Sequence, residues 1–327
     1  MLAATTLMVP MRKEAGDTPF VQELKEIPGL KVRIDEPLAR YTSMKIGGPA
    51  DYLLDVERSA ALSRVLKLLD RCGIPFCVLG KGSNILISDL GVRGAVIRFA
   101  GEFQQAEWVE KDGEALVTVG AACPVARLMR AAARRGLSGL ECAEGIPGSV
   151  GGALVMNAGA YGSEMERIVA RVEGVTEKGA PLSLERGEMV FTYRDSHLPP
   201  GTLVTRVCLR LAKGKADDVG LKVRELVVRR KSSQPSGYPN CGSVFRNPPG
   251  DFAGRLIEAA GLKGKRIGRA EISVKHANFI VNLGGAKAAD VRGLMDAARA
   301  EVKKQFNIEL QPEVRLLGEW PPRSAAE

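Results

Sequence analysis

The stretch from Gly145 to Gly162, GIPGSVGGALVMNAGAYG, constrains the fold more than any other part of the chain. It holds six glycines in eighteen residues, with no run of charge and one proline. Each glycine loses more backbone freedom on folding than any other residue and brings no side chain to pack, so glycines at this density weaken a helix or strand. We therefore expect something to lie so close to this backbone that side chains are not tolerated there.

A second glycine cluster, VLGKGSNILISD, runs from Val78 to Asp89. The dinucleotide fingerprint G-x-G-x-x-G is excluded because its last position holds Ile85 and a strand pattern follows. A P-loop is excluded because Lys81 is followed by Gly82. Two interpretations remain open for this cluster alone: a plain hairpin turn, or a turn whose backbone N–H groups bind a pyrophosphate.

The two clusters together favour a ligand. Asn84, Ser149 and Asn157 supply hydrogen-bonding side chains within them. Two glycine-rich loops on separate elements indicate an extended ligand laid along the backbone between two subdomains. A flavin dinucleotide has the length and shape for this arrangement.

Composition narrows the class of protein. The chain of 327 residues is long enough for two or three domains. Its net charge of +9 concentrates between Lys222 and Lys275, where twelve Lys/Arg face four Asp/Glu. Such a segment attracts phosphates. Aromatic residues make up only 5% of the chain and do not interleave with the segment, which favours small anionic ligands over nucleic acid.

Other classes are disfavoured by the cysteines and by hydropathy. The six cysteines form no CxxC pair, and the chain has two histidines, so we expect neither a metal site nor a disulfide framework. No segment has the apolar length of a membrane span. The N-terminal apolar run precedes the positive charges, the reverse of a secretory signal, so we expect a cytoplasmic protein.

Periodicity predicts a mixture of helices and strands. Residues 51–101 read as β-α-β with a hairpin-like continuation, and residues 100–212 as short alternating strands with one helix at 125–136. Helices follow at 221–231, 252–264 and 288–307, with strands at 276–284 and 308–320. Lys, Gly and Asp replace the apolar alternation near residue 213, which marks a domain boundary there.

Seven motifs, taken in order, resemble the UDP-N-acetylenolpyruvoylglucosamine reductase family. The resemblance extends from about residue 25 to 320, and single motifs carry less weight than the series. The motifs are YTSMKIGGPAD (41–51), LGKGSNILI (79–87), the glycine-rich stretch 145–162, FTYRDS (191–196), CGSVFRNP (241–248), HANFIVN (276–282) and LQPEVRLLG (310–318).

This resemblance implies an α+β fold. It predicts an irregular N-terminal segment (1–24), a two-subdomain FAD-binding unit of the vanillyl-alcohol-oxidase type (25–100 and 101–213) and a C-terminal α/β substrate-binding domain (214–327). It also implies the reaction: NADPH passes a hydride to FAD, and the reduced flavin passes it to UDP-N-acetylglucosamine enolpyruvate, giving UDP-N-acetylmuramate for peptidoglycan. The implied partners are the sugar nucleotide and NADPH, with no nucleic acid or membrane, and the implied protein is a monomer.

The resemblance assigns three catalytic residues. Arg194 holds the substrate carboxylate, because a guanidinium offers a fixed fork of donors and stays charged. Glu313 lies on the other side of that carboxylate. Ser243 delivers the proton that completes the reduction of the double bond.

Binding residues follow from the same motifs. Substrate contacts are expected at Tyr193, Arg229, Gly242, Asn247, Lys263 and His276. Cofactor contacts are expected at Tyr41, Lys45, Gly47, Leu79, Gly80, Lys81, Gly82, Ser83, Asn84, Gly145, Ile146, Pro147, Gly148, Ser149, Gly151, Gly152, Asn157, Gly159, Ala160 and Tyr161.

The chain also departs from the family pattern. Ser233 stands where some members have a lysine, and Lys231 is the candidate substitute. The segment between Ser196 and Gln234 is short, as in the branch of the family that lacks an extra tyrosine-bearing loop. Two alternatives stay open: another FAD oxidoreductase of the same architecture, acting on a lactone or an alcohol, and a basic nucleic-acid-binding protein. No histidine that would tether a flavin lies in either glycine loop.

Overall fold

The computed structural model describes residues 18–160 and 162–321, without the side chain of Cys142. Within it the chain divides into two compact units. The first comprises residues up to 34, 52–81 and 94–228, and the second comprises residues 35–51, 82–93 and 229 onward. Tyr161 and most of the expected irregular N-terminal segment lie outside the described residues.

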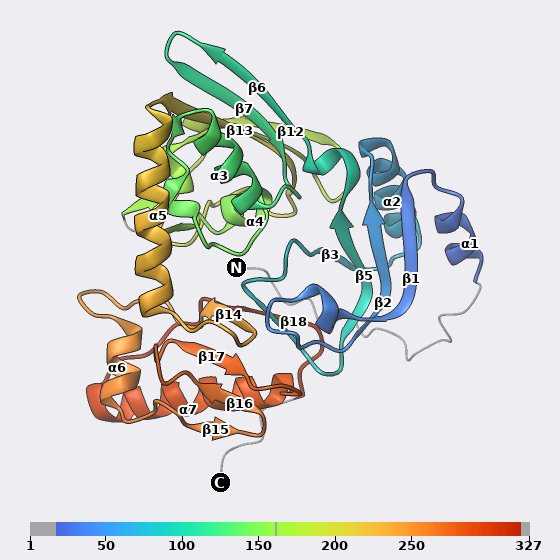
Figure 1. Ribbon diagram of the computed structural model, residues 1–327. Coiled ribbons are helices and arrows are strands. Elements are labelled where there is room, and N and C mark those ends of the chain that lie inside the picture. The colour runs from blue at the N-terminus through green and yellow to red at the C-terminus, as the bar shows by residue number, and fades with distance from the viewer. Residues whose placement is uncertain (1–17, 161, 322–327) are drawn as a thin grey trace. The chain divides into compact units, whose positions relative to one another are not determined.

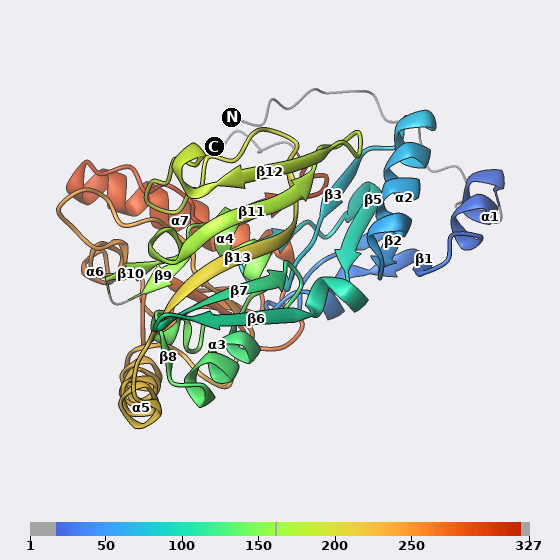
Figure 2. The same ribbon diagram turned by 90° about the horizontal axis from the view of Figure 1, so that it is seen from above.

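A four-stranded sheet opens the first unit, and two helices accompany it. The strand order is β1-β2-β5-β3, and β3 runs parallel to β5. Helix α2 covers one face of this sheet (Figures 1 and 2). The elements are α1 (Pro19–Lys25), β1 (Leu30–Pro37), β2 (Pro49–Val56), α2 (Ser59–Arg71), β3 (Phe76–Val78) and β5 (Val92–Phe99).

Helix α2 forms where the apolar residues recur every three to four positions. Its six buried residues contribute to one hydrophobic core together with Leu54 of β2 and Ile97 of β5. The helix ends where Gly73 adopts a φ of +62°, a conformation that favours glycine. Gly73 therefore closes this helix.

A larger antiparallel sheet forms the rest of the first unit. Its order is β12-β11-β13-β7-β6, with β8 also paired to β13. Helices α3 and α4 pack on one face, as Figure 2 shows, and contribute to a second core. The elements are β6 (Ala106–Lys111), β7 (Glu114–Gly120), α3 (Val125–Arg134), β8 (Leu137–Ser138), α4 (Val150–Val155), β9 (Gly159–Ala160), β10 (Ser163–Glu164), β11 (Val169–Val175), β12 (Pro181–Glu185), β13 (Leu203–Lys213) and α5 (Ala216–Ser233), whose last turn belongs to the second unit.

The second unit contains a sheet in the order β14-β17-β16-β15 and a two-stranded parallel pair, β18-β4. Helix α7 lies along the four-stranded sheet (Figure 1). The elements are β4 (Ile85–Ile87), β14 (Asn240–Ser243), α6 (Ala253–Ala259), β15 (Arg266–Ile267), β16 (Ala270–Ile272), β17 (Phe279–Asn282), α7 (Ala288–Phe306) and β18 (Arg315–Leu317).

Helix α7 begins at a cap from a distant part of the sequence. The Asp89 carboxylate accepts hydrogen bonds from the backbone N–H groups of Ala288 (2.8 Å) and Ala289 (3.0 Å). These are among the N–H groups that a helix N-terminus leaves without an internal partner. A negative charge there also interacts favourably with the helix dipole.

Two strand predictions are wrong. Residues 85–87 do not continue a hairpin with 92–99 but pair in parallel with β18. The final segment, expected as a strand over 308–320, is a strand only at Arg315–Leu317. Pro312, which has no N–H for a strand ladder, interrupts the earlier part. No helix among the described residues is long and apolar enough to span a membrane.

Candidate active site

The two glycine-rich loops meet in the first unit at one hydroxyl group. A Cβ atom added to Gly80 would lie 2.7 Å from Ser149 Oγ, and one added to Gly152 would lie 3.3 Å from the same atom. Ser149 is buried at the N-cap of α4, where its Oγ accepts from Gly152 N at 3.4 Å. The backbone at Gly80 and Gly152 is exposed beside this hydroxyl. The two loops therefore form one backbone-lined surface.

Other glycines of the long loop are required by the protein's own packing. A Cβ on Gly151 would lie 2.7 Å from Ala121 Cβ, and one on Gly159 would lie 2.1 Å from Ser163 O. Gly145 has a φ of +68°. The close approach expected from the sequence is therefore partly internal, and Gly152 is the exposed position where an added Cβ would meet no atom closer than 3.3 Å.

Within the second unit, the Tyr41 motif packs against the end of the other glycine loop. A Cβ on Gly82 would lie 2.4 Å from Tyr41 O, and Ser43 N donates to Gly82 O at 3.0 Å. The exposed Lys45 has a φ of +57°. Gly47 packs against Ile87, which is 3.1 Å from a Cβ at that position.

Asn84 connects this loop to the C-terminal motif of the same unit. Its side-chain Nδ2 donates to the backbone carbonyl of Glu313 at 3.1 Å, and its backbone carbonyl accepts from Arg315 N at 3.0 Å. These bonds extend the parallel pairing of β4 and β18 to the segment that carries Glu313.

Arg194 is carried by a tight turn in the first unit. Thr192 and Asp195 exchange two backbone hydrogen bonds, of 2.9 and 3.1 Å, with Tyr193 and Arg194 between them. Arg194 has a φ of +62°, which is strained for a residue other than glycine. Its guanidinium lies 5.0 Å from the centre of the Tyr193 ring, which is exposed. Strain of this kind is found where function fixes a side chain's direction.

Ser243 and Glu313 belong to neighbouring segments of the second unit. Glu313 N donates to Val244 O at 2.8 Å, directly after Ser243, and Phe245 forms a bridge with Pro312. Ser243 ends β14 after a register shift, and Gly242 has a φ of +78°. The structure therefore brings two of the three predicted catalytic segments together, while Arg194 belongs to the first unit.

One predicted catalytic residue and two predicted substrate residues line one hollow of about 390 Å³ in the second unit. They are Ser243, Asn247 and His276. Lys263 lies next to it and forms an ion pair of 2.7 Å with Glu258, a lining residue. Phe252, Arg255 and Lys275, which were not among the predicted site residues, also line the hollow. Of these three, only Lys275 had a signal in the sequence, because it directly precedes the HANFIVN motif.

His276 is held in one orientation at this hollow. Its Nδ1 accepts from Asn278 N at 3.2 Å, and its ring contacts Phe279 edge to face. Burial, assisted by the charge of Lys263, lowers the pKa of His276 below its usual value. The imidazole is therefore neutral at physiological pH. Gly254 leaves room for it, because a Cβ there would lie 2.9 Å from His276 Cε1.

The remaining predicted substrate contact, Arg229, is exposed on α5. Its carbonyl accepts from Ser233 Oγ at 2.9 Å, so Ser233 is used within the helix. Lys231, the candidate substitute for the family's lysine, offers its carbonyl to Lys275 Nζ at 2.5 Å. This bond connects the end of α5 to a residue of the 390 Å³ hollow.

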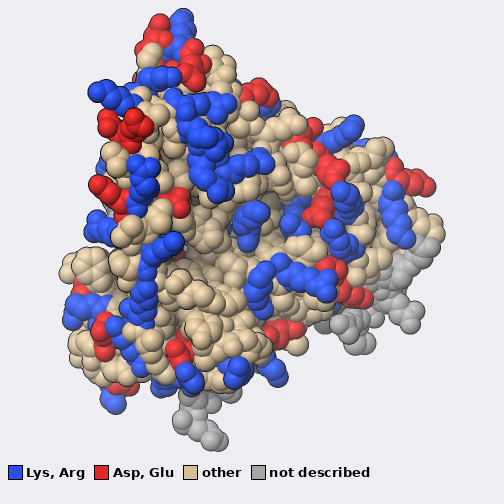
Figure 3. Space-filling view, in the orientation of Figure 1, with Lys and Arg blue, Asp and Glu red and all other residues tan. Residues whose placement is uncertain are grey.

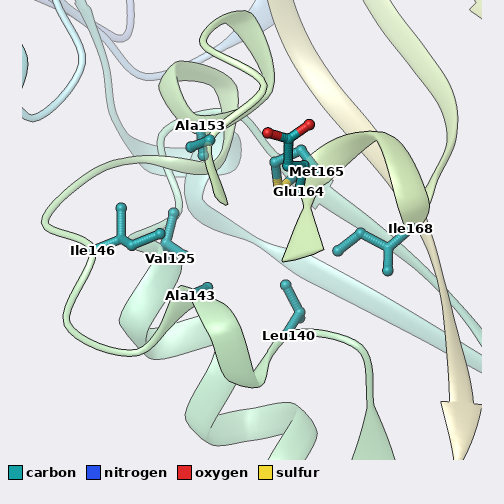
Figure 4. A pocket seen from close by; sticks show the side chains of 9 residues that line it. Val125, Leu140, Ala143, Ile146, Ala153, Glu164, Met165 and Ile168 are labelled. Atoms are coloured by element: carbon teal, nitrogen blue, oxygen red, sulfur yellow. The ribbon is translucent and has the colours of Figure 1, made fainter. Parts of the chain in front are cut away.

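A further cavity, inside the first unit, is too small for a ligand. Figure 4 shows Val125, Leu140, Ile146 and Ile168 among the side chains that line it. Its volume is about 10 Å³, which is close to the minimum for one water molecule. This cavity is a packing feature of the first unit.

The basic side chains are partly neutralised by acidic ones. On the face shown in Figure 3, Lys and Arg gather most densely over α3. Within the basic segment 222–275, acidic residues neutralise at least four of the basic side chains. These ion pairs are Lys222–Glu141, Arg255–Asp251, Lys263–Glu258 and Arg266–Glu271. In the described part of the chain, no group of three or more His, Cys, Asp or Glu could hold a metal ion.

The residues of the first unit suit a dinucleotide. The exposed backbone at Gly80 and Gly152 and the exposed Lys81 supply polar groups and positive charge without bulky side chains beside them. Such a surface is complementary to a diphosphate.

Two family models match the sequence. One, described as FAD binding domain, matches residues 50–185. The other, described as UDP-N-acetylenolpyruvoylglucosamine reductase, C-terminal domain, matches residues 234–317. The expected fold class, a FAD-binding unit followed by a C-terminal domain with mixed helices and strands, is confirmed.

Proteins described as UDP-N-acetylenolpyruvoylglucosamine reductases match this chain over nearly their whole length. UDP-N-acetylenolpyruvoylglucosamine reductase 2 of Symbiobacterium thermophilum is 47% identical over 93% of this chain and 98% of its own. The reductase of Halalkalibacterium halodurans is 43% identical over 92% and 99%. Among solved structures, UDP-N-acetylenolpyruvylglucosamine reductase from Thermus caldophilus matches with a TM-score of 0.75 and 41% identity, covering 88% of this chain and 98% of that one.

Proposed function

This chain belongs to the UDP-N-acetylenolpyruvoylglucosamine reductase family, and from that premise we propose that it reduces UDP-N-acetylglucosamine enolpyruvate with NADPH to UDP-N-acetylmuramate. Members of this family are oxidoreductases that act in peptidoglycan precursor synthesis. The observation that carries the proposal is the pairing of the Ser243 and Glu313 segments, which are joined by the bond from Glu313 N to Val244 O. That pairing puts a hydroxyl and a carboxyl group on adjacent backbone.

FAD is the cofactor that the matched domain implies, and when bound it supplies hydride transfer from NADPH to the enolpyruvyl double bond. The residues proposed to hold its diphosphate are Gly80, Lys81, Ser149 and Gly152. Lys81 is proposed to supply positive charge and Ser149 to hold the start of α4, while the exposed backbone of Gly80 and Gly152 lets a diphosphate approach without a side chain in the way.

Arg194 is proposed to bind the substrate carboxylate. Hydride addition to the terminal carbon of the double bond builds negative charge on the neighbouring carbon and on the attached carboxylate. A guanidinium donates two parallel hydrogen bonds to a carboxylate and keeps its charge throughout. Glu313 is proposed to lie on the other side of that carboxylate, where Arg194 offsets the charge of the pair.

Ser243 is proposed to donate its hydroxyl proton to the carbon next to the carboxylate. A neutral hydroxyl is a weak acid, but a positioned one transfers its proton to a strongly basic carbon when water is excluded. The neutral His276 and Asn247, in the same hollow, are proposed to contact the sugar nucleotide.

The test separates the two half-reactions by rapid mixing under anaerobic conditions. Ser243→Ala is expected to leave flavin reduction by NADPH unchanged within about twofold, because the serine acts only afterwards. Flavin reoxidation by the enolpyruvyl substrate is expected to slow by roughly 10²-fold or more, the lower range for loss of a general acid. Equal slowing of both steps would remove Ser243 from this role. Absence of any reoxidation in the unaltered protein would refute the function itself.

A further inference from the structure

Asn157 is a fully buried polar residue inside the glycine-rich loop. Its exposed fraction is 0%, and its φ is +39°, in the region that asparagine tolerates better than most residues. It follows α4, which ends at Val155. A buried amide at such a position requires partners for both of its ends.

The side chain joins two other segments of the first unit, one with Glu164 and Glu166 and one with Thr192. Asn157 Nδ2 donates to Glu164 Oε2 at 2.9 Å and to Thr192 O at 3.1 Å, while Oδ1 accepts from Glu166 N at 3.0 Å. Glu164 is the one carboxyl group among the side chains of Figure 4. Two acceptors face the nitrogen and one N–H faces the oxygen, so the partners fix the amide orientation.

One of these partners belongs to the turn that carries Arg194. Thr192 O also accepts from Asp195 N at 3.1 Å, across the two residues Tyr193 and Arg194. The Asn157 amide therefore supports the base of this turn from the glycine-rich loop. Ser196 Oγ, which donates to Val155 O at 3.2 Å, is a second polar connection between the same two segments.

We propose that Asn157 is a positioning residue for substrate reduction: its amide fixes the Thr192–Asp195 turn against the glycine-rich loop and thereby sets the direction of Arg194. The proposal rests on the proposed function, in which Arg194 binds the substrate carboxylate. It gives Asn157 a role inside the protein, different from the cofactor contact expected from the sequence. Arg194 needs this support because its φ of +62° is not a conformation that arginine favours.

Two variants separate positioning from general stability. Asn157→Asp is isosteric, but an ionised carboxylate has no hydrogen to donate to Thr192 O and is repelled by Glu164. In the double variant, which combines Asn157→Asp with Glu164→Gln, the new glutamine amide donates to the introduced carboxylate and removes the repulsion. The hydrogen bond to Thr192 O stays absent in both variants.

The measurements are the thermal midpoint, flavin reduction by NADPH, the KM for the enolpyruvyl substrate and the Kd of the product, UDP-N-acetylmuramate, for the oxidised protein. We expect Asn157→Asp to lower the midpoint and to weaken substrate and product binding by roughly tenfold, the scale of one lost hydrogen bond. The double variant should recover the midpoint and keep the binding defect. Flavin reduction should change by less than about twofold in either. Thr205→Val, which removes a hydroxyl that donates to Glu173 O elsewhere in the unit, should leave both binding constants unchanged.

Recovery of binding together with stability in the double variant would overturn the proposal, because Asn157 would then act only on folding. Unchanged binding in Asn157→Asp would overturn it as well. If Asn157→Asp does not fold, the double variant provides the same comparison against the unaltered protein. Failure of the proposed function is distinguishable, since the unaltered protein would then neither bind the product nor reduce the substrate.

Discussion

Replacement of Arg194 by glycine separates the stability of its turn from the chemistry proposed for its side chain. The φ of +62° costs a non-glycine residue about 1–2 kcal/mol, which glycine avoids. Glycine in turn adds roughly 0.5–1 kcal/mol of conformational freedom to the unfolded chain. Loss of the contact with the Tyr193 ring removes about 0.5–1 kcal/mol at an exposed site. These terms nearly cancel, so Arg194→Gly should change the free energy of unfolding by less than about 1 kcal/mol.

Activity should respond very differently. Removal of a donor aimed at developing negative charge lowers kcat by about 10²–10³-fold, equivalent to about 2.7–4 kcal/mol. Arg194→Gly should therefore lower kcat/KM for the enolpyruvyl substrate by at least that factor, while NADPH still reduces the flavin. Arg194→Lys keeps the positive charge and the strained φ but lacks the planar fork, so it should retain more activity than glycine at unchanged stability.

Urea unfolding followed by fluorescence gives the free energy, and NADPH oxidation in the presence of substrate gives kcat/KM. If Arg194→Gly lowers the free energy of unfolding by more than about 2 kcal/mol, the side chain has a structural role, because the change expected for this substitution is much smaller. Activity within about threefold of the unaltered protein would refute its proposed role in catalysis.

Three further predictions concern single sites. Burial lowers the pKa of His276, so the protein should become less stable as the pH falls below about 6.5, where the unfolded state takes up a proton that the folded state does not. His276→Gln should flatten this part of the curve of unfolding free energy against pH. An unchanged slope would contradict the lowered pKa of His276. Gly151→Ala should lower the free energy of unfolding, measured by urea titration, by about 1–3 kcal/mol, because the added methyl group meets Ala121. Gly187→Ala is the control, since a Cβ added at Gly187 has no atom within 4 Å. Equal effects of the two substitutions would refute the packing argument. Iodoacetamide should label the exposed Cys72 but not Cys241, whose pKa burial raises to about 12, and mass spectrometry showing rapid labelling of Cys241 in the native protein would contradict its burial.

The parts of the fold that follow from local sequence were predictable. The apolar period of Ser59–Arg71 and the glycine after it specify α2, and the long amphipathic run specifies α7. The parallel pairing of Ile85–Ile87 with Arg315–Leu317 was not predictable in this way. Its register depends on tertiary packing between segments more than two hundred residues apart, and each strand is too short to show a period of its own.

The site followed the same division. Glycine density located both loops, but it did not show that Gly151 and Gly159 are required by the protein's own atoms while Gly80 and Gly152 lie beside the Ser149 hydroxyl. Nor does the sequence show that Asn157 is buried, because asparagine is more often exposed in loops.

The proposed function is tested most directly by a single anaerobic mixing experiment with the purified protein. NADPH is added to bleach the flavin, and UDP-N-acetylglucosamine enolpyruvate is then added without oxygen. We predict that the flavin absorbance returns and that UDP-N-acetylmuramate, detected by mass spectrometry, forms in an amount equal to the flavin reoxidised. A protein without flavin, or a reduced flavin that persists after the sugar nucleotide is added, would contradict it.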